Sequence, residues 1–436
     1  MVAKGFAPVA PYDLVVFGAT GFVGKIVCQY LLDTVGVAGD LRWAIAGRSI
    51  PKLEQLVKDL GPHTALPVCV ADAADEATLR DLCAQTRVVI STVGPYARYG
   101  EPLVKVCAET GTDYCDLTGE AQWVRRMVQT YGALAQRSGA RIVHCCGFDS
   151  IPSDLGVYAL QHQAQRRFGQ PCQRVKMRVK AAQGGISGGT IASGINLVKE
   201  AAANPALRQE WANPYSLCLD LQTVQTAQTA KTHPPTLIPV QYDAAFQAWV
   251  TPFVMAEINT RIVLRSQGLL EQADGAPLTY GPNFQYDEGI LTGTGIVGGL
   301  VAHALKISLT GLGIAAALGP TRWLLEQTIV PAPGAGPSPA AQAEGFYDLR
   351  FWGETATGQT LELKVTGDRD PGYGSTAKIL GQAGLCLAQD CPKTAKPGGF
   401  WTPATLFGEG LIDRLINQAG LTFAVREAHM GAFSSL

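Results

Sequence analysis

The sequence lacks an excess of charge of either sign. Its 436 residues contain 35 Lys and Arg against 36 Asp and Glu, which gives a formal net charge of -1. A protein that grips the phosphate backbone of a nucleic acid needs a basic surface, so we expect no nucleic-acid partner. Hydrophobic residues make up 47% of the chain, which is enough for a large core. The length predicts two or three domains.

The sequence also lacks paired cysteines. Its 11 cysteines are scattered and form no CxxC pair, which argues against a structural zinc site. Residues 1–11 do not show a basic start followed by an apolar run, the pattern of a secretory signal. We therefore expect reduced thiols, no metal and a cytoplasmic location. An HExxH sequence, a kinase signature and a Ser-His-Asp order are absent as well.

The first 150 residues alternate short apolar runs with helical patterns. Strands alternating with helices over short connections predict a parallel sheet covered by helices on both faces. We therefore predict an α/β fold, with a Rossmann-type doubly wound domain over residues 1–150. Its expected strands are Asp13–Phe17, Arg42–Ala46, Leu66–Val70, Val88–Thr92, Asp113–Leu117 and Arg141–Cys145.

Residues 151–370 predict a second, α+β domain built on a mixed or antiparallel sheet. Arg174–Lys180 alternates apolar residues with cations, as a strand with one face toward water does. Thr260–Leu264 is expected to join it. So are Tyr347–Trp352 and Thr360–Val365, which should pair across a turn. The basic residues of this region that could bind an anionic substrate are few, namely Arg174, Arg178, Lys180, Arg208, Arg261 and Arg265. Several of them alternate along strand faces that are expected to face water. Pro331–Pro339 is expected to be a loop.

The run Gly295–Gly319 is long and apolar enough to invite a membrane interpretation. It carries His303 and Lys306 near its middle, however, and a charge at the bilayer centre costs about 2.5–3.5 kcal/mol. We therefore favour one or two buried helices, broken near Thr310–Gly313, over a spanning helix. Peripheral contact with a membrane or lipid surface is the alternative.

A glycine motif follows the first expected strand and opens a helix. It consists of Gly18, Ala19, Thr20, Gly21, Phe22, Val23 and Gly24. In this context the glycines permit a tight turn, a close approach of the backbone to a pyrophosphate, and close packing of helix on strand. The helix N-terminus adds free N–H groups and a partial positive charge for phosphates. The motif predicts a dinucleotide site.

The end of the second expected strand indicates which dinucleotide is bound. NAD sites usually place a carboxylate there for the ribose 2′-OH, but this strand ends in Gly47, Arg48 and Ser49. A guanidinium holds a 2′-phosphate bidentately, and the Ser49 hydroxyl can donate to it. We therefore predict NADP(H). Asp72, after the third strand, is a candidate neighbour of the adenine.

Polar residues follow the next three strands at the sheet edge where ligands bind. Thr92, Val93, Gly94 and Pro95 are expected to run along the nicotinamide ribose. Reduction needs a hydride and a proton from separate donors. The candidate proton donors are Tyr96, Asp116, Glu120 and Asp149. For Asp116 and Asp149, a turn or helix-cap role fits equally well. His144 is expected to be a buried, hydrogen-bonded histidine.

Several motifs resemble those of the saccharopine dehydrogenase-like oxidoreductases, and within that group the branch of trans-acting enoyl reductases. They are GATGFVG (Gly18–Gly24), AGRS (Ala46–Ser49), TVGPY (Thr92–Tyr96), YCDLTGE (Tyr114–Glu120), CGFDSIP (Cys146–Pro152), GGISGGT (Gly184–Thr190), GDRDPGYGSTAKILGQAG (Gly367–Gly384) and GFWTPATLFGEGLIDRL (Gly399–Leu415). The resemblance implies an NADP-binding Rossmann domain joined to a smaller α+β domain. It also implies that helices from residues 371–420 return to the first domain, with Ser375–Ala388 as the candidate.

The resemblance leaves three functions open. The first is NADPH-dependent reduction of a C=C bond in an apolar, lipid or carrier-linked intermediate, which the glycine-rich stretches Gly184–Gly194 and Gly289–Gly319 favour. The second is oxidation or reduction of a C–N bond of an amino acid, as in the saccharopine dehydrogenases. The third is a non-catalytic, lipid-associated protein that keeps its nucleotide for stability. A homodimer through the second sheet is expected from the general frequency of twofold oligomers.

Overall fold

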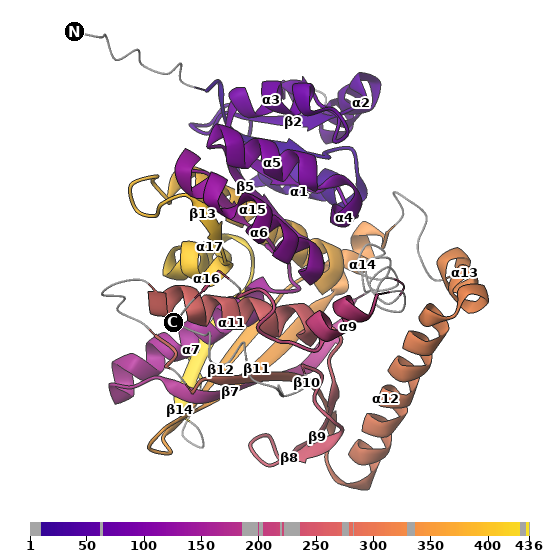
Figure 1. Ribbon diagram of the computed structural model, residues 1–436, viewed down its shortest axis with the longest axis vertical. Helices are drawn as coiled ribbons and strands as arrows, with labels where there is room; N and C mark the ends of the chain where they lie inside the picture. Colours follow the sequence, from indigo (N-terminus) through magenta and orange to yellow (C-terminus); the bar gives the residue numbers. More distant parts are fainter. Residues whose placement is uncertain are drawn as a thin grey trace.

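Two β-sheets, each with its own helices, form the frame of the molecule in this computed structural model (Figure 1). The structure describes residues 10–61, 64–184, 199, 204–218, 220–221, 236–272, 279–281, 283–328, 336–427 and 433–435. Most of the predicted stretches Gly184–Gly194 and Pro331–Pro339 lie outside these residues.

The first sheet is parallel throughout and has the strand order β13-β6-β5-β4-β1-β2-β3. Without β13 this is the order 6-5-4-1-2-3 of a doubly wound dinucleotide-binding sheet, so the predicted fold class is confirmed. Its strands are β1 (Tyr12–Phe17), β2 (Trp43–Gly47), β3 (Val68–Val70), β4 (Thr86–Ser91), β5 (Asp113–Asp116), β6 (Arg141–Val143) and β13 (Gly399–Trp401).

Helices cover both faces of this sheet because each buries one apolar stripe. In α1, for example, Val27, Cys28 and Leu31 are buried at helical spacing. Several of these helices end on a glycine in the left-handed region, as helix C-termini often do. The helices of this half are α1 (Phe22–Val35), α2 (Ile50–Leu60), α3 (Glu76–Ala84), α4 (Tyr96–Tyr99), α5 (Glu101–Thr110) and α6 (Ala121–Ser138). The next helix, α7 (Ile151–Phe168), packs on β7, β11 and β12 of the second sheet instead.

The second sheet is mixed, as predicted, with the order β15-β14-β12-β11-β7-β10-β9-β8. The predicted hairpin is present, because β11 and β12 pair antiparallel. One face of these strands is buried and the other is half-exposed. The strands are β7 (Cys172–Gln183), β8 (Gln241–Asp243), β9 (Ala248–Pro252), β10 (Gln285–Gly293), β11 (Phe346–Thr355), β12 (Thr360–Gly367), β14 (Thr422–Glu427) and β15 (Ser434–Ser435).

The predicted strand at Thr260–Leu264 is wrong, because this segment lies inside helix α11 (Ala256–Gln272). Its β-branched residues have a high strand propensity, which led to the wrong prediction. Yet Arg261 and Arg265, one helical turn apart, both bond to residues that follow α9 (Pro205–Trp211). Tertiary contacts thus decide the conformation against local propensity.

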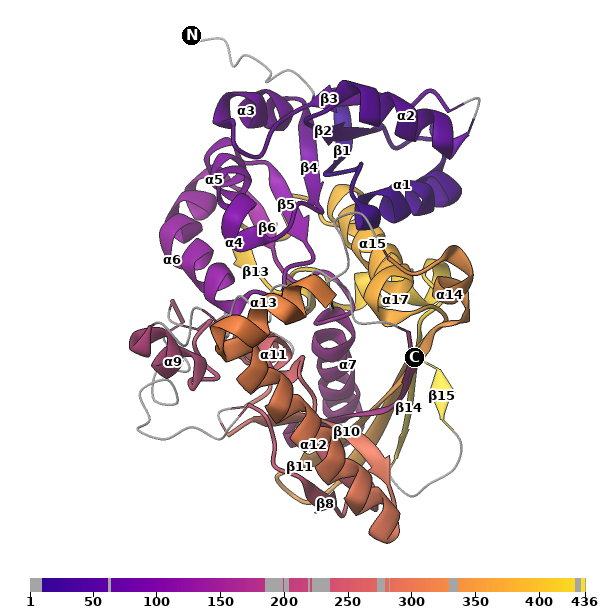
Figure 2. The ribbon, with the colours of Figure 1, turned by 90° about the vertical axis from the view of Figure 1, so that its right-hand side faces the viewer.

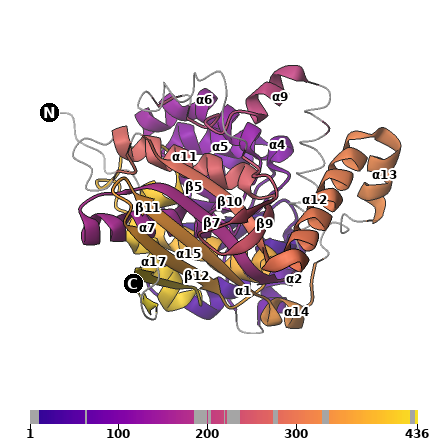
Figure 3. The ribbon, with the colours of Figure 1, turned by 90° about the horizontal axis from the view of Figure 1, so that it is seen from below.

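The prediction for Gly295–Gly319 is wrong in two respects. The segment forms one unbroken helix, α12 (Gly295–Ala317), and that helix is largely exposed. Figures 1 and 3 show α12 and α13 (Gly319–Thr328) along one flank, outside the two sheets. Within the described chain, α12 alone is long and apolar enough to cross a membrane by length and composition, and 11% of its most apolar window is buried.

The C-terminal part of the chain returns to both sheets. Helix α15 (Thr376–Gln389) corresponds to the predicted helix Ser375–Ala388 and packs on the first sheet beside α1 (Figure 2). There Gly381 faces Tyr30, and Gly384 faces Ile90 of β4. Strand β13, which we did not predict, extends the first sheet, whereas β14 joins the second. The remaining elements are α14 (Pro339–Glu344), η1 (Pro371–Ser375), α16 (Pro403–Leu406) and α17 (Gly408–Gln418). The domain limits at residues 150 and 370 stay a prediction.

Candidate nucleotide and catalytic site

The glycine loop between β1 and α1 is shaped by contacts that leave no room for side chains. Gly18 has φ +85°, and a Cβ on it would lie 2.7 Å from a Val93 methyl. A Cβ on Gly24 would lie 2.3 Å from the Gly18 carbonyl oxygen. Gly21 differs, because it is exposed and a Cβ there would meet only that oxygen, at 3.2 Å. Gly18 and Gly24 therefore serve the turn, and Gly21 keeps the loop's outer surface open to a ligand.

The N-terminus of α1 is free to receive a phosphate. Gly21 is its N-cap and supplies no side-chain cap, and the first turn contains no acidic residue. The first N–H groups of a helix have no partner within the helix, so these can point to an anion. In the same loop Ala19 is buried, Thr20 and Val23 are half-buried, and the Phe22 ring meets Tyr373 of η1 edge-on at 5.0 Å. The predicted pyrophosphate site fits this geometry.

Arg48 lies exposed just beyond β2 and makes no hydrogen bond or ion pair with the described residues. Ser49 is the N-cap of α2, but its hydroxyl makes no capping bond. Both groups are therefore available to a 2′-phosphate, and the fit supports NADP(H). Asp72 is half-buried, and its Oδ1 accepts a hydrogen bond from the Ala74 N–H at 3.0 Å. This turn role leaves Oδ2 of Asp72 for a ligand.

The segment after β4 lies against the glycine loop. The Thr92 hydroxyl donates to the Phe17 and Gly18 carbonyls at 3.2 and 3.1 Å, which fixes the two loops together. Val93 is half-buried, whereas Gly94 and Pro95, joined by a cis peptide bond, are exposed at the rim. Thr92–Pro95 thus runs beside the glycine loop, where the nicotinamide end of a dinucleotide is expected.

Two of the predicted proton donors, Tyr96 and Glu120, are used to hold α4 in place. Tyr96 is 5% exposed, and its hydroxyl donates to the Ser91 carbonyl at 2.9 Å. Burial raises the pKa of Tyr96 well above 10. The Glu120 carboxylate, also buried, accepts from the Tyr96 and Ala97 N–H groups at 2.9 and 3.0 Å. We assign both residues to positioning rather than proton transfer.

A third candidate, Asp116, is the last residue of β5, at the carboxyl edge of the sheet, and is completely buried. Its Oδ1 accepts from the backbone N–H groups of Thr118 and Cys145, each at 3.1 Å. Its Oδ2 accepts from the Tyr114 hydroxyl at 2.9 Å and lies 2.7 Å from His144 Nδ1. Four partners leave Asp116 no contact with a substrate, so the turn alternative describes it best. His144 is 3% exposed and hydrogen-bonded, as predicted.

The fourth candidate, Asp149, differs from the other three. It follows β6, is half-buried, and makes no hydrogen bond or ion pair within the described part of the chain. Burial raises the pKa of its carboxyl group to about 6. The neighbouring Phe148 fixes the loop, because its N–H donates to Thr376 Oγ1 at 3.0 Å. Asp149 is therefore an unpartnered carboxyl group beside an anchored backbone, and it can carry a proton near pH 6.

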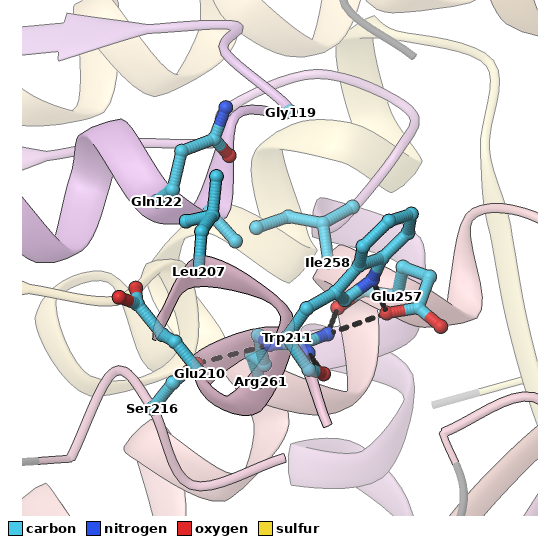
Figure 4. Close-up of a pocket in the computed structure, with 10 residues that line it drawn as sticks. Gly119, Gln122, Leu207, Glu210, Trp211, Ser216, Glu257, Ile258 and Arg261 are labelled. Atoms are coloured by element: carbon cyan, nitrogen blue, oxygen red, sulfur yellow. Dashed lines mark hydrogen bonds and ion pairs between the residues drawn. The ribbon is translucent and has the colours of Figure 1, made fainter. Parts of the chain in front are cut away.

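A pocket opens beside the same edge and is lined by residues of α6, α9 and α11 (Figure 4). Gly119 belongs to its lining, and Asp149 Oδ2 lies 3.9 Å from where a Cβ on Gly119 would be. Leu207, Trp211 and Ile258 provide apolar surface. Our reading of the sequence missed these residues, because no motif marks them and α11 was predicted to contain a strand.

The charged side chains that line this pocket are paired with other groups of the protein. Arg261 donates to Ser216 Oγ at 3.0 Å and to Glu257 Oε2 at 2.9 Å. The Trp211 indole N–H donates to the same Glu257 oxygen at 2.6 Å (Figure 4). This guanidinium is consequently committed to its protein partners, and the pocket offers an apolar lining with few free charges.

Known proteins resemble both the first domain and the whole chain. Residues 14–143 match the model of the saccharopine dehydrogenase NADP binding domain. A trans-acting enoyl reductase of Mycobacterium tuberculosis is 37% identical over 411 residues, covering 93% of this chain and 95% of the relative. One from Mycobacterium leprae is 35% identical over 417 residues, with the same coverage. Saccharopine dehydrogenase (L-Glu forming) from Saccharomyces cerevisiae has a similar fold, with a TM-score of 0.50, 12% identity, and coverage of 95% of this chain and 99% of that one.

Proposed function

This chain belongs to the trans-acting enoyl reductase family and is an NADP-dependent oxidoreductase, and we propose that it reduces the C=C bond of an apolar enoyl substrate. The observation that carries the proposal is the unpartnered carboxyl group of Asp149, which follows β6 at the carboxyl edge of the first sheet and lies beside Gly119 of the pocket lining. The substrate is a lipid or polyketide-type intermediate, linked to a carrier.

Each group of the site has a separate task in this reaction. NADPH, when bound, supplies a hydride for the β-carbon of the enoyl group. Arg48 and Ser49 hold the 2′-phosphate, and the N-terminus of α1 holds the pyrophosphate. Asp149 supplies the proton for the α-carbon, so that one hydride and one proton together saturate the double bond.

Asp149 is suited to this proton transfer because its surroundings favour the neutral acid. Its raised pKa leaves part of the carboxyl population protonated near pH 6 to 7. A substrate bound at this edge of the sheet excludes water from Asp149, which raises the pKa of its carboxyl group further. The buried networks around Glu120 and Asp116 keep the neighbouring loops in register.

The arginines of β7 and α11 argue against an amino-acid substrate. A substrate with several carboxylates needs free arginines, and we expected several of the basic residues of this region to face water. Arg178, Arg261 and Arg265 are instead 2% exposed or less, and each is paired with a carboxylate of the chain. Saccharopine-type C–N chemistry is therefore the weaker candidate.

The test is to follow NADPH oxidation with α,β-unsaturated acyl thioesters of increasing chain length. We expect NADPH consumption and a product heavier than its substrate by two hydrogens, with long apolar acyl chains preferred. Oxidation of saccharopine, or reduction of the imine formed from glutamate and an aldehyde, would replace this proposal by the C–N reaction. NADPH that binds but is not consumed with any of these substrates would favour a non-catalytic protein.

A further inference from the structure

Helix α12 presents apolar side chains to solvent on a scale found nowhere else in the described chain. Among the described residues, eighteen large hydrophobic side chains are exposed, and ten of these lie between residues 296 and 323. The most exposed are Ile296 at 83%, Val297 at 72% and Ile307 at 71%. Apolar patches of this kind mark surfaces that bind another molecule or a membrane.

The inner side of α12 explains how such a helix stays attached to the protein. Its buried positions are small residues, namely Gly298, Gly299, Ala302 and Ala316. A Cβ on Gly299 would come within 3.1 Å of the Trp249 ring of β9, and Thr251 Oγ1 donates to the Ala302 carbonyl at 3.0 Å. The small residues thus allow the helix to lie close to β9, and the large ones point away.

The exposed apolar residues of α12 are not confined to one narrow stripe along the helix. Ile296, Ile307 and Ile314 are separated by close to whole numbers of helical turns and lie on the outermost side. The exposed Val297, Val301 and Leu312 lie on a neighbouring flank. A second helix covers only one seam, about two positions in seven, and would leave the other flank in water. The fluid apolar interior of a lipid bilayer covers both flanks of the helix. A helix that is apolar around most of its circumference fits a lipid environment.

The charges of this region favour a lipid surface with anionic headgroups. No carboxylate occurs from residue 289 to residue 325, whereas Lys306 and Arg322 are cationic. Trp323, which is 63% exposed, lies on α13 beyond the end of α12. Tryptophan and basic side chains are favoured at the boundary between headgroups and acyl chains.

We propose that the outer face of α12, with the start of α13, docks in the plane of an anionic lipid bilayer. The helix inserts from one side and does not cross the bilayer, because its inner side is held against β9 and β10 (Figures 1 and 2). This surface is distinct from the nucleotide site, so the proposal does not depend on the reaction.

Flotation of the full chain with lipid vesicles tests this proposal. We expect the protein to float with vesicles of phosphatidylcholine and phosphatidylglycerol, and more weakly with phosphatidylcholine alone. Ile307→Ser/Ile314→Ser should lower vesicle affinity at least tenfold. The matched control Val37→Ser/Val70→Ser removes two exposed hydrophobic residues elsewhere and should change the affinity less than twofold. Unchanged urea midpoints will show that both variants are folded.

A separate variant tests the role that we assign to the two cationic residues. Lys306→Glu/Arg322→Glu should reduce binding to the anionic vesicles severalfold and leave binding to pure phosphatidylcholine unchanged. Absence of flotation with every vesicle would overturn the proposal. So would a dimer in light scattering that Ile307→Ser/Ile314→Ser dissociates in the absence of vesicle binding, because the occupant would then be a second copy of the chain.

Discussion

The carboxyl edge of the first sheet and the interior of the second sheet use charged residues in opposite ways. At the first, Arg48 and Asp149 make no ion pair or hydrogen bond with the described residues. In the second, the Arg178 side chain is 0% exposed and donates to Asp243 Oδ2 at 2.9 and 2.7 Å. Arg48 and Asp149 are thus left without a partner at the first sheet's edge, whereas Arg178 is paired inside the second sheet.

This difference distinguishes charged groups that can serve a ligand from charged groups that stabilise the fold. A charged group that is buried must be paired, because desolvation is costly. A charged group that is held in place without a partner has been left for something outside the chain. By this criterion Asp116 and Glu120, although on the same rim as Asp149, belong with the structural group.

The largest effect is expected for Asp149→Asn, because removal of a general acid typically lowers the rate by about 10²–10⁴. The carboxyl group must be protonated to act, so kcat/KM of the wild type should fall as the pH rises through about 6. The variant should lose this dependence. The measurement is kcat/KM for enoyl reduction from pH 5 to 9. As a control, the folded fraction of Asp116→Asn should keep the pH dependence of kcat/KM. If Asp149→Asn also kept the pH dependence of the wild type, Asp149 would have no part in the mechanism.

A second expected effect is on stability. Arg178→Met leaves Asp243 buried with only the partly exposed Lys176 as a cationic partner, and it should lower the free energy of unfolding by about 3–5 kcal/mol. Urea unfolding measures this change. On the same strand, Arg174 pairs with Glu354 at the surface, so Arg174→Met should cost less than about 1 kcal/mol. Similar losses from both substitutions would mean that burial does not distinguish these arginines.

A third effect links stability to pH. Glu288 is completely buried, and burial raises the pKa of its carboxyl group from 4.5 to about 7. Its contribution is full below pH 4.5 and is lost as the pH rises toward 7, where the unfolded chain is ionised and the folded one resists ionisation. The wild type should therefore lose about 3 kcal/mol relative to Glu288→Gln over this range. Urea unfolding of both proteins at pH 4.5 and 8 tests the shift, and a difference that does not change with pH would contradict it.

The sequence predicts the nucleotide-binding half well because its signals there are local. A glycine turn between a strand and a helix, and the residue type at the end of β2, depend on few distant contacts. Helix α11 could not be predicted in this way, because its β-branched residues favour a strand. Its helical conformation depends on tertiary contacts, among them those of Arg261 and Arg265 across the fold.

Helix α12 and the proton donor show a second limit. Composition identifies an apolar helix but not whether protein covers it, and here most of it is uncovered. Likewise, the positions of Tyr96, Asp116, Glu120 and Asp149 after strands predict that they meet at one rim. Their different roles follow from which of them find partners in the folded chain.

Calorimetric titration with NADPH and NADH tests the central claim most directly, because Arg48 is assigned to the 2′-phosphate alone. The wild type should bind NADPH more than tenfold tighter than NADH, a difference above about 1.4 kcal/mol. Arg48→Met should bring the two affinities together by weakening NADPH, while Arg137→Met, which removes an exposed arginine on α6, should leave the ratio unchanged. Equal affinities in the wild type, or a preference for NADPH that survives Arg48→Met, would contradict this account of the site.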